Sequence, residues 1–285
     1  MTNADLSLMH EVLAVAEAAG REIMAIYADA RRWAVQAKAD ESPLTAADLA
    51  AHHCIVAELA GVAAPWHALP VLSEESAEAE LAGRRNWPAC WLVDPLDGTK
   101  EFIARNGEFS VNIALIVGDA AVLGVVHGPA TGVSYVAAKG LGSFRVDVSG
   151  WHRIHSAALP VQGERPIQLT VSRRHGLEQL VLFEQALIDD FGVVQSVPAG
   201  SAFKICAVAE GRADAYPRFG PTSEWDTAAA QVVLEEAGGY LIDSQGRAFR
   251  YNRRDTLLNA GFLAVGSEPQ RWLNYCTPTQ MSIGG

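Results

Sequence analysis

Apolar residues recur at helical spacing near the start of the chain and at strand spacing further on. Intervals of three and four residues predict helices over residues 6–28 and 46–59. Between residues 109 and 148 the apolar runs are short and separated by glycines, which is typical of strands joined by tight turns. The strands predicted there are 109–115, 121–126, 132–137 and 142–148. We therefore expect two helices followed by an antiparallel meander.

The pattern changes after Pro166, where strand-length apolar runs alternate with helical spacing. Strands are predicted over residues 167–171, 193–197, 213–216 and 240–243, and helices over 177–189, 202–210 and 226–237. Pro160, Gly163 and Pro166 cluster between the two patterns. We predict an α/β (mixed α+β) protein of two tightly joined subdomains, residues 1–162 and 163–285, without an internal repeat or a low-complexity linker.

The composition is that of an ordinary soluble globular enzyme, since 49% of the 285 residues are hydrophobic and 19% are charged. The formal net charge of −11 argues against a nucleic-acid polymer as partner, because binding to a phosphate backbone needs clustered Lys and Arg. A small phosphorylated substrate would have to be attracted locally, by bound cations and a few placed basic groups that reverse the field inside a cleft.

The four cysteines, Cys54, Cys90, Cys206 and Cys276, are scattered without a Cys-x-x-Cys, so neither a zinc site nor a disulfide framework is predicted. The sequence contains no stretch of about 18 uninterrupted apolar residues. Its first residues do not form a charged segment followed by a long apolar one. We expect a cytoplasmic protein without an integral membrane segment.

Candidate chemistry is concentrated in residues 91–102, W-L-V-D-P-L-D-G-T-K-E-F. An apolar strand needs no acid at its end, so Asp94 and Asp97 have to be satisfied by a cation or by turn amides. Pro95 is expected to stop the hydrogen-bond ladder and to free the Leu96 carbonyl. Two carboxylates and a free carbonyl are ligands that suit Mg²⁺.

The glycine turn that follows suggests an anion site beside the cation site. Gly98 lets the chain approach a ligand closely, and the amides of Gly98 and Thr99 are free donors before any helix that follows. The alternative is that Asp94 and Asp97 are merely turn and helix-cap residues, because Asp-Pro and Asp-Gly are common turn dipeptides. This segment alone leaves both interpretations open.

Three other segments contain acids in comparable settings. Glu74 and Glu75 end a short apolar run, where strand alternation turns at most one of them inward. Asp48 follows Thr45 by three residues at the start of a predicted helix, which on its own favours a capping-box variant. Asp226 opens an alanine-rich helix, where its charge could simply complement the helix dipole.

In order, type and spacing, these four segments resemble the inositol monophosphatase superfamily of Mg²⁺-dependent, Li⁺-sensitive sugar and nucleotide phosphatases, across nearly the whole chain. The superfamily pattern is a Glu-Glu pair, then Asp-Pro-apolar-Asp-Gly-Thr, then Trp-Asp far downstream. D-G-T-K-E-F (97–102), R-N-G-E-F-S-V-N-I-A-L (105–115) and Y-P-R-F-G-P (216–221) are similar to one subgroup, the bacterial 3'(2'),5'-bisphosphate nucleotidases of the CysQ type. The resemblance implies a layered αβαβα sugar-phosphatase fold with an antiparallel N-terminal sheet and the site between the halves.

The resemblance also implies roles for the acidic residues. Two or three Mg²⁺ ions would be held by oxygen ligands alone, most of them from the N-terminal subdomain: Glu74, Asp94, the Leu96 carbonyl, Asp97 and Asp226. Asp97 would bridge the ions. The nucleophile would be a metal-activated water oriented by the Thr99 hydroxyl, which passes a proton to Asp48 as general base. Glu74, Asp48 and Thr99 are thus the predicted catalytic residues.

The predicted nucleotide contacts lie mostly in the C-terminal subdomain. Ser201 and the first amides of a helix are expected to receive the non-scissile phosphate, with charge from Lys204; the alternative is an ordinary cap and a solvated lysine. Ser172 and His175 follow a strand, where loops contact ligands in α/β sheets, although a lone loop histidine is more often simply exposed. Arg218 is the better candidate for the ribose or 5'-phosphate. Further substrate contacts are expected at Asp97, Gly98, Thr99 and Asp226.

We therefore predict a hydrolase that removes the 3'-phosphate of adenosine 3',5'-bisphosphate to give AMP and phosphate, with the 2',5' isomer as a further substrate. The resemblance places such an activity in sulfur assimilation. The alternatives are an inositol-1-phosphate or fructose-1,6-bisphosphate phosphatase that uses the same metals, and a phosphonucleotide-binding regulator without turnover. The resemblance leaves peripheral association with the inner membrane open, and the sequence does not indicate an oligomeric state.

Overall fold

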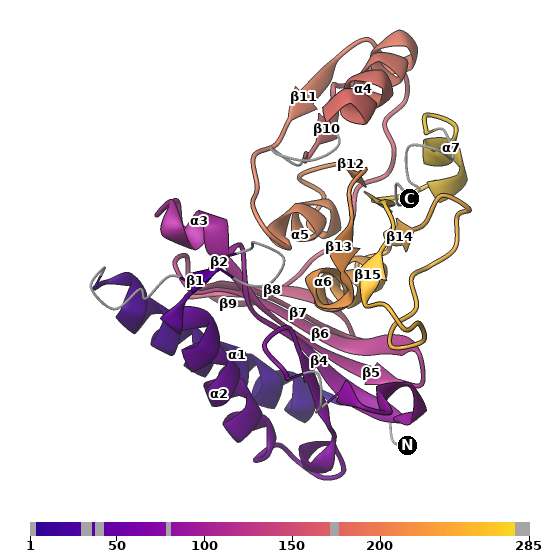
Figure 1. The fold of residues 1–285 in the computed structure, drawn as a ribbon. Helices are drawn as coiled ribbons and strands as arrows, with labels where there is room; N and C mark the ends of the chain where they lie inside the picture. Colours follow the sequence, from indigo (N-terminus) through magenta and orange to yellow (C-terminus); the bar gives the residue numbers. More distant parts are fainter. Residues whose placement is uncertain (1–3, 30–35, 38–42, 78–80, 172–176, 277–285) are drawn as a thin grey trace.

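The computed structural model of the protein describes residues 4–29, 36–37, 43–77, 81–171 and 177–276. Among these residues, helices and sheets alternate in five layers (Figure 1). Two helices cover one face of a seven-stranded sheet, two more cover its other face, and a five-stranded sheet with its own helices follows. Clusters of buried apolar side chains fill the space between the layers. The predicted layered αβαβα fold is confirmed.

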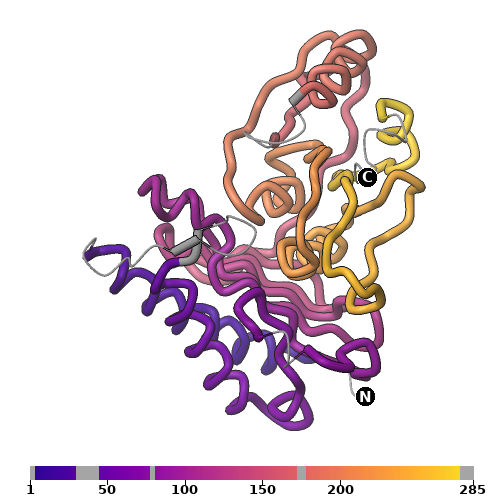
Figure 2. The backbone as a smooth tube through the Cα atoms, in the orientation of Figure 1, coloured from indigo at the N-terminus to yellow at the C-terminus, as the bar shows by residue number. Residues whose placement is uncertain are grey.

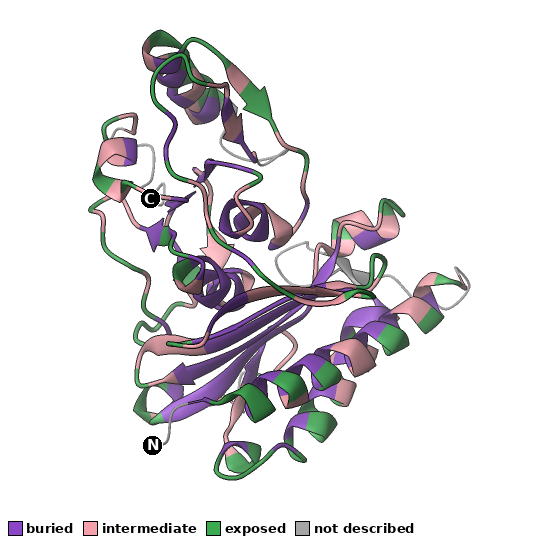
Figure 3. Cartoon of the chain, turned by 180° about the vertical axis from the view of Figure 1, so that it is seen from behind, coloured by how far each residue is buried: buried purple, intermediate pink, exposed green. Residues whose placement is uncertain are grey.

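The first layer consists of α1 (Leu6–Tyr27) and α2 (Ala46–Leu59), which pack against each other and against the larger sheet. Apolar residues at intervals of three and four form the buried face of α1. They include Met9, Val12, Ala16, Ala19 and Ile23. Both helices expose their outward faces, whereas the strands behind them are buried (Figure 3). The two helices predicted from this spacing are therefore confirmed.

The larger sheet is a meander with one added strand. Its order is β3 (Val71–Ser73), β4 (Ala89–Asp97), β5 (Ser110–Val117), β6 (Ala120–Gly128), β7 (Val133–Ala138), β8 (Gly142–Asp147) and β9 (Gly150–Arg153). Each neighbouring pair is antiparallel except β3 and β4, which are parallel. The predicted antiparallel meander is confirmed over β5 to β8. The hydrophobic pattern does not foresee β9, because four residues are too few to show a period.

Alternate residues of β4 point to different layers, since the larger sheet is covered on both faces. Trp91 belongs to the cluster shared with α1 and α2. Leu92 belongs to the cluster formed with α5 (Phe203–Ala209) and α6 (Glu224–Glu236) on the opposite face. By the same alternation, Asp94 lies on the α6 side of the sheet. The first carboxylate of the Asp-Pro-Leu-Asp motif is thereby directed toward the later half of the chain.

Small residues let α6 lie close to the larger sheet. A Cβ atom at Gly124 on β6 would lie only 2.2 Å from the carbonyl oxygen of Ala229 on α6, so glycine is required for this approach. Ala228 and Ala230 beside it are also fully buried. This backbone contact fixes the height of α6 above the sheet, and with it the position of Asp226.

The smaller sheet has the order β11 (Val194–Ser196), β10 (Ile167–Leu169), β12 (Ala215–Arg218), β16 (Phe262–Val265) and β14 (Tyr240–Ile242). β10 is parallel to β11 and β12, whereas β16 is antiparallel to β12 and β14. α4 (Leu177–Phe191) and α7 (Pro269–Leu273) pack on it through a separate apolar cluster. The predicted alternation of strands and helices is confirmed, with bounds that differ by a few residues.

Short elements complete the described structure. They are β1 (Gln36–Ala37), β2 (Pro43–Leu44), α3 (Thr99–Ile103), β13 (Thr222–Ser223), β15 (Leu258–Asn259) and 3₁₀ turns at Trp66–Ala68 and Arg84–Asn86. β13 pairs with β15 at the start of α6. No helix in the described part of the chain is long and apolar enough to cross a membrane.

The chain passes from the larger to the smaller sheet between residues 153 and 167 (Figure 2). The predicted boundary at residue 162 falls in this connection. α5 and α6 follow the boundary in sequence but pack on the larger sheet, so the two halves interlock. The division into two subdomains stays a prediction.

Candidate active site

Acidic side chains gather where the larger sheet meets α2 and α6. Asp94 on β4 is only 1% exposed. Burial raises the pKa of its carboxyl well above the usual value, and the charges of Glu74, Asp97, Asp226 and Asp48 raise it further. The predicted acids therefore lie within electrostatic range of one another, although they come from four separate segments. Such a cluster is destabilising unless protons or cations neutralise it.

A β-bulge in β4 places the two motif carboxylates. Asp94 pairs with Asn112 on β5, and after a shift of register Asp97 lies opposite Ser110. Pro95 lies inside this irregular stretch, and β4 continues to Asp97. The ladder is interrupted at Pro95 as expected, but it resumes at Asp97 and does not stop there. The proline interrupts the ladder locally, and the bulge gives both carboxylates a place beside the same strand.

The turn after β4 leaves backbone groups for a ligand. The Leu96 carbonyl receives a long contact of 3.4 Å from the Thr99 hydroxyl, which leaves it acceptor capacity. Gly98 has a φ of 92°, and a Cβ atom there would lie 2.3 Å from Ser201 Oγ. No side chain among the described residues caps α3, which begins after Gly98. Its first amides therefore have no side-chain cap to compete with an anion, and the predicted anion contact stays a prediction.

Asp97 is held by groups from two other elements. Its Oδ2 accepts hydrogen bonds from Asn112 Nδ2 at 3.3 Å and from the Ser110 hydroxyl at 3.5 Å. Burial raises the pKa of Asp97, whereas the charge of Lys204 and hydrogen bonds from Asn112 and the Ala202 amide lower it. The N-terminal end of α5 is thus turned toward Asp97, and Lys204 lies close enough to act on the acidic cluster.

Asp48 serves as a helix cap and also contacts the motif turn. Its Oδ2 accepts hydrogen bonds from the Thr45 amide at 2.8 Å and from the Thr45 hydroxyl at 2.6 Å. The amide bond is one half of a capping box at the start of α2, whose other half is the Asp48 amide donating to the Thr45 side chain. Asp48 Oδ1 accepts from the Thr99 hydroxyl at 3.2 Å. The capping interpretation is confirmed, and it is compatible with a catalytic role because each oxygen makes a different contact. The general-base role stays a prediction.

Asp226 repeats this arrangement at the start of α6. The Ser223 amide donates to its Oδ2 at 2.8 Å in a second capping box. Burial raises the pKa of Asp226 to about 8, the charges of Asp97 and Glu74 add to the rise, and the Ser223 amide and Arg218 oppose it. With one oxygen held by the cap, the other remains for the acidic cluster.

The Ser201 hydroxyl makes internal contacts. It lies 2.9 Å from the Asp97 carbonyl oxygen and 2.8 Å from the Glu108 carbonyl oxygen, and its single proton serves these acceptors. The N-cap of α5 is Ala202, so Ser201 does not cap the helix in the usual way. A phosphate contact by Ser201 stays a prediction, and it would have to compete with these carbonyls.

Two predicted cationic residues lie beside the cluster. Lys204 lowers the pKa of Asp97 and places its Nζ 5.5 Å from the centre of the Tyr216 ring. Arg218 lowers the pKa of Asp226, and its guanidinium also donates to the Pro221 carbonyl at 2.9 Å. The predicted contacts Ser172 and His175 lie outside the described residues.

Asn112 is a site residue that the sequence analysis does not single out. It is 1% exposed, is the third residue of β5 and donates to Asp97, and every later residue of that strand is apolar. The usable signal is this amide within S-V-N-I-A-L-I-V, because a buried polar side chain needs a specific partner. The sequence of β5 alone does not identify this partner, because the bulge in β4 is what brings Asp97 next to Asn112.

The ligand chemistry fits a hard divalent cation. The predicted ligands are carboxylate and carbonyl oxygens, which Mg²⁺ prefers. As the side chains stand, no three His, Cys, Asp or Glu residues in the described ranges are close enough to enclose an ion. Binding of Mg²⁺ therefore requires these carboxylates to draw together, and the charge of the cation would offset their mutual repulsion.

Comparison with known families and proteins gives a consistent result. The model of the inositol monophosphatase family matches residues 8–275. A 3'(2'),5'-bisphosphate nucleotidase CysQ from Salmonella typhimurium is 43% identical over 257 residues, which cover 90% of this chain and 98% of the relative. The corresponding protein of Haemophilus influenzae is 34% identical over 93% of this chain and 95% of its own length.

Solved structures agree with the fold. CysQ from Bacteroides thetaiotaomicron, described as a bacterial member of the inositol monophosphatase family, superposes with a TM-score of 0.76 and 37% identity. The match covers 91% of this chain and 97% of that protein. An inositol monophosphatase from Thermotoga maritima has a TM-score of 0.72 at 22% identity, and this second likeness concerns the fold alone.

The raised pKa of Asp226 predicts how the metal-free protein responds to pH. Its carboxyl titrates near 8 when folded and has an ordinary value of 3.8, so between these values the folded state holds the extra proton. Stability should therefore fall as the pH rises toward 8. Buried His127, whose pKa is lowered to about 4 from 6.5, acts in the opposite direction only below about pH 6.5.

Thermal unfolding of chelator-treated protein at pH 6.5 and pH 8 tests this expectation, because this interval lies above the range in which the histidine acts. The raised pKa values of Asp94 and Asp97 act in the same direction as that of Asp226. The unfolding midpoint should be lower at pH 8 than at pH 6.5. Added Mg²⁺ should raise the midpoint more at pH 8 than at pH 6.5. In Asp226→Asn the midpoint should depend less on pH between these two values. A metal-free midpoint that rises across this interval would contradict the assignment.

Proposed function

This chain belongs to the inositol monophosphatase family, and we propose that it is a Mg²⁺-dependent 3'(2'),5'-bisphosphate nucleotidase. It would remove the 3'-phosphate of adenosine 3',5'-bisphosphate, and the 2'-phosphate of the 2',5' isomer, to give AMP and phosphate. Identity of 43% over 90% of the chain to a nucleotidase of that name supports the substrate class. The observation that carries the chemistry is the Thr99–Asp48 hydrogen bond beside the buried carboxylates.

Mg²⁺ would supply a Lewis acid that neutralises the phosphate and makes a bound water more acidic. The residues proposed to hold it are Glu74, Asp94, Asp97, Asp226 and the Leu96 carbonyl. Support comes from the charge balance, because burial and mutual repulsion raise the pKa values of Asp94, Asp97 and Asp226. Such groups cannot all be anionic ligands unless a cation offsets their mutual repulsion.

Thr99 and Asp48 are proposed to orient and deprotonate the attacking water. The Thr99 hydroxyl donates to Asp48 Oδ1, so its own oxygen can accept a proton from the water. The Thr45 amide and hydroxyl hold Asp48 Oδ2, which prevents the carboxylate from rotating away. A proton can then pass from water through Thr99 to Asp48.

The nucleotide is proposed to lie between the halves, on the side of α5 and β12. Lys204 and Arg218 act electrostatically on Asp97 and Asp226, so both cations are within reach of a phosphate at the cluster. We assign Lys204 to the non-scissile phosphate and Arg218 to the ribose or 5'-phosphate. Ser201, Ser172 and His175 remain proposed contacts. The first amides of α3, next to Gly98, are proposed to receive the scissile phosphate.

A substrate panel tests this function most directly. Phosphate release should be measured with adenosine 3',5'-bisphosphate, inositol-1-phosphate and fructose-1,6-bisphosphate in Mg²⁺. We expect kcat/KM to favour the first by at least about tenfold, which needs only ~1.4 kcal/mol of differential transition-state binding. Chelator, or Asp94→Asn, should remove nearly all turnover.

The alternatives predict different results in the same panel. A sugar phosphatase would release phosphate from inositol-1-phosphate or fructose-1,6-bisphosphate at least as fast as from the nucleotide. A regulator would bind the nucleotide tightly and release no phosphate in Mg²⁺. Full activity in chelator would contradict the metal-dependent mechanism itself.

The proposed proton path predicts non-additive mutations. Asp48→Asn and Thr99→Ala should each lower kcat by about 10²- to 10⁴-fold, because each breaks the same path. The double variant should be hardly slower than the slower single variant, since residues that act as a unit are not additive. Dependence on Mg²⁺ should change far less than kcat does.

Asp5 offers a matched control for the capping role of Asp48. It caps α1 by accepting from the Leu8 amide at 2.9 Å and has no part in the site. Asp5→Asn and Asp48→Asn should change the unfolding midpoint by similar small amounts, because Asn caps almost as well as Asp. Only Asp48→Asn should lose turnover. A kcat near that of the wild type for Asp48→Asn would end the general-base proposal.

A further inference from the structure

Glu224 begins α6 two residues before Asp226 and is not among the proposed ligands. It is fully buried. Its Oε2 accepts from the Asn252 amide at 2.6 Å, and its Oε1 accepts from Arg254 Nη2 at 3.3 Å. Burying a carboxylate is costly unless donors of this kind satisfy it. A role in positioning the start of α6 would explain why a buried carboxyl group is found at Glu224 despite this cost.

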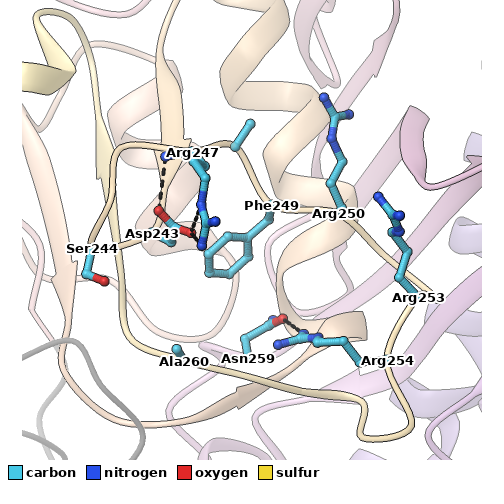
Figure 4. A pocket seen from close by; sticks show the side chains of 10 residues that line it. Asp243, Ser244, Arg247, Phe249, Arg250, Arg253, Arg254, Asn259 and Ala260 are labelled. Atoms are coloured by element: carbon cyan, nitrogen blue, oxygen red, sulfur yellow. Dashed lines mark hydrogen bonds and ion pairs between the residues drawn. The ribbon is translucent and has the colours of Figure 1, made fainter.

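Arg254 connects Glu224 with Ser223, the residue whose amide binds Asp226, through Asn259. Its Nη2 also donates to Asn259 Oδ1 at 3.0 Å (Figure 4). This orients the Asn259 amide so that its Nδ2 donates to the Ser223 carbonyl at 3.0 Å. Ser223 in turn donates its own amide to Asp226 Oδ2 at 2.8 Å. A continuous series of hydrogen bonds thus runs from Glu224 to the proposed metal ligand.

Arg84 connects residues 252–255, the segment that contains Arg254, to the N-terminal half of the chain. It is 8% exposed and donates from Nη1 to Asn252 Oδ1 at 2.8 Å, and from Nη2 to the carbonyls of Arg254 and Asp255 at 2.7 and 2.6 Å. Asn252 Nδ2 returns a bond to the Arg84 carbonyl at 2.7 Å. Asn252 has a φ of 55°, a left-handed conformation that Asn tolerates better than most residues.

The outer side of this network is open to solvent. Arg254 lines a cavity of about 570 Å³, and its side chain is 42% exposed (Figure 4). Two other arginines there form ion pairs with carboxylates, Arg247 with Asp243 and Arg253 with Asp119. Arg254 can therefore be changed without opening the core, while the buried end of its ion pair, Glu224, lies beside α6.

We propose that Glu224 is a positioning residue for Asp226. Through Arg254 and Asn259 it fixes Ser223 and the first turn of α6, so that one oxygen of Asp226 stays on the Ser223 amide and the other faces the acidic cluster. The inference rests on the proposed metal-dependent function. Partners that orient metal ligands typically change metal affinity by about 10- to 100-fold when they are mutated.

Mg²⁺ binding to Glu224→Gln, measured by calorimetry and by the Mg²⁺-induced rise of the unfolding midpoint, tests the proposal without turnover. We expect binding at least about tenfold weaker than in the wild type, because the amide cannot hold Arg254 as the carboxylate does. Arg254→Lys should weaken binding in the same direction, since Arg254 Nη2 donates to both Glu224 and Asn259 from a rigid planar group, and the ammonium on a flexible lysine stem does not fix these two directions.

Asp214→Asn is the matched control. Asp214 is a 2% exposed carboxylate that accepts from Arg165 at 2.6 and 2.8 Å and from the Gln168 amide at 2.8 Å, away from α6. This variant should lose stability as Glu224→Gln does, yet bind Mg²⁺ like the wild type. Such a pattern would separate positioning from a general loss of stability.

Mg²⁺ affinity within about twofold of the wild type in Glu224→Gln, or in Arg254→Lys if Glu224→Gln fails to fold, would overturn the inference, given the change expected for an orienting partner. Equal weakening in Asp214→Asn would overturn it as well, because the effect would then follow stability. Absence of Mg²⁺ binding by the wild-type protein would instead overturn the proposed function on which the inference rests.

Discussion

The structure is organised around carboxylates that repel one another. Asp94 is buried among Glu74, Asp97, Asp226 and Asp48, and its pKa is raised first by burial and then by these charges. Such an arrangement costs stability unless protons or a cation neutralise it, since hydrophobic residues would fill the same space at lower cost. The bulge in β4, the close contact of α6 with β6 and the network at Glu224 are best understood as the means of holding these acids in place.

In each of two capping boxes, one carboxyl oxygen accepts the capping hydrogen bond and the other is left for a different contact. Asp48 in α2 and Asp226 in α6 occupy the same helical position, and in both a neighbouring hydroxyl residue supplies an amide to Oδ2. Capping is therefore compatible with the chemistry proposed for these residues. A cap fixes the rotation of the side chain, and a fixed side chain is what a ligand or a proton acceptor requires.

The sequence predicts those features that depend on local order. Helical spacing in α1 and the glycine-separated runs of β5 to β8 identify the first two layers, and the acids stand in short motifs. The features that it does not predict depend on distant contacts or on local irregularity. Arg84 meets Asn252 across 168 positions, and no property of either residue indicates the other. Pro95 interrupts β4 without ending it, because the strand resumes beyond a bulge that pairing with β5 makes possible.

The location of the metal in a crystal is the most direct test of this account. Crystals grown with Mn²⁺ and AMP would show the ions by their anomalous scattering, and AMP would mark the nucleotide. We predict peaks about 2.0–2.3 Å from carboxylate oxygens of Glu74, Asp94, Asp97 and Asp226, at the spacing of hard cations and oxygen ligands, with the nucleotide toward Lys204 and Arg218. Ions bound elsewhere, with these carboxylates still apart, would contradict the claim that the acidic cluster is a metal site.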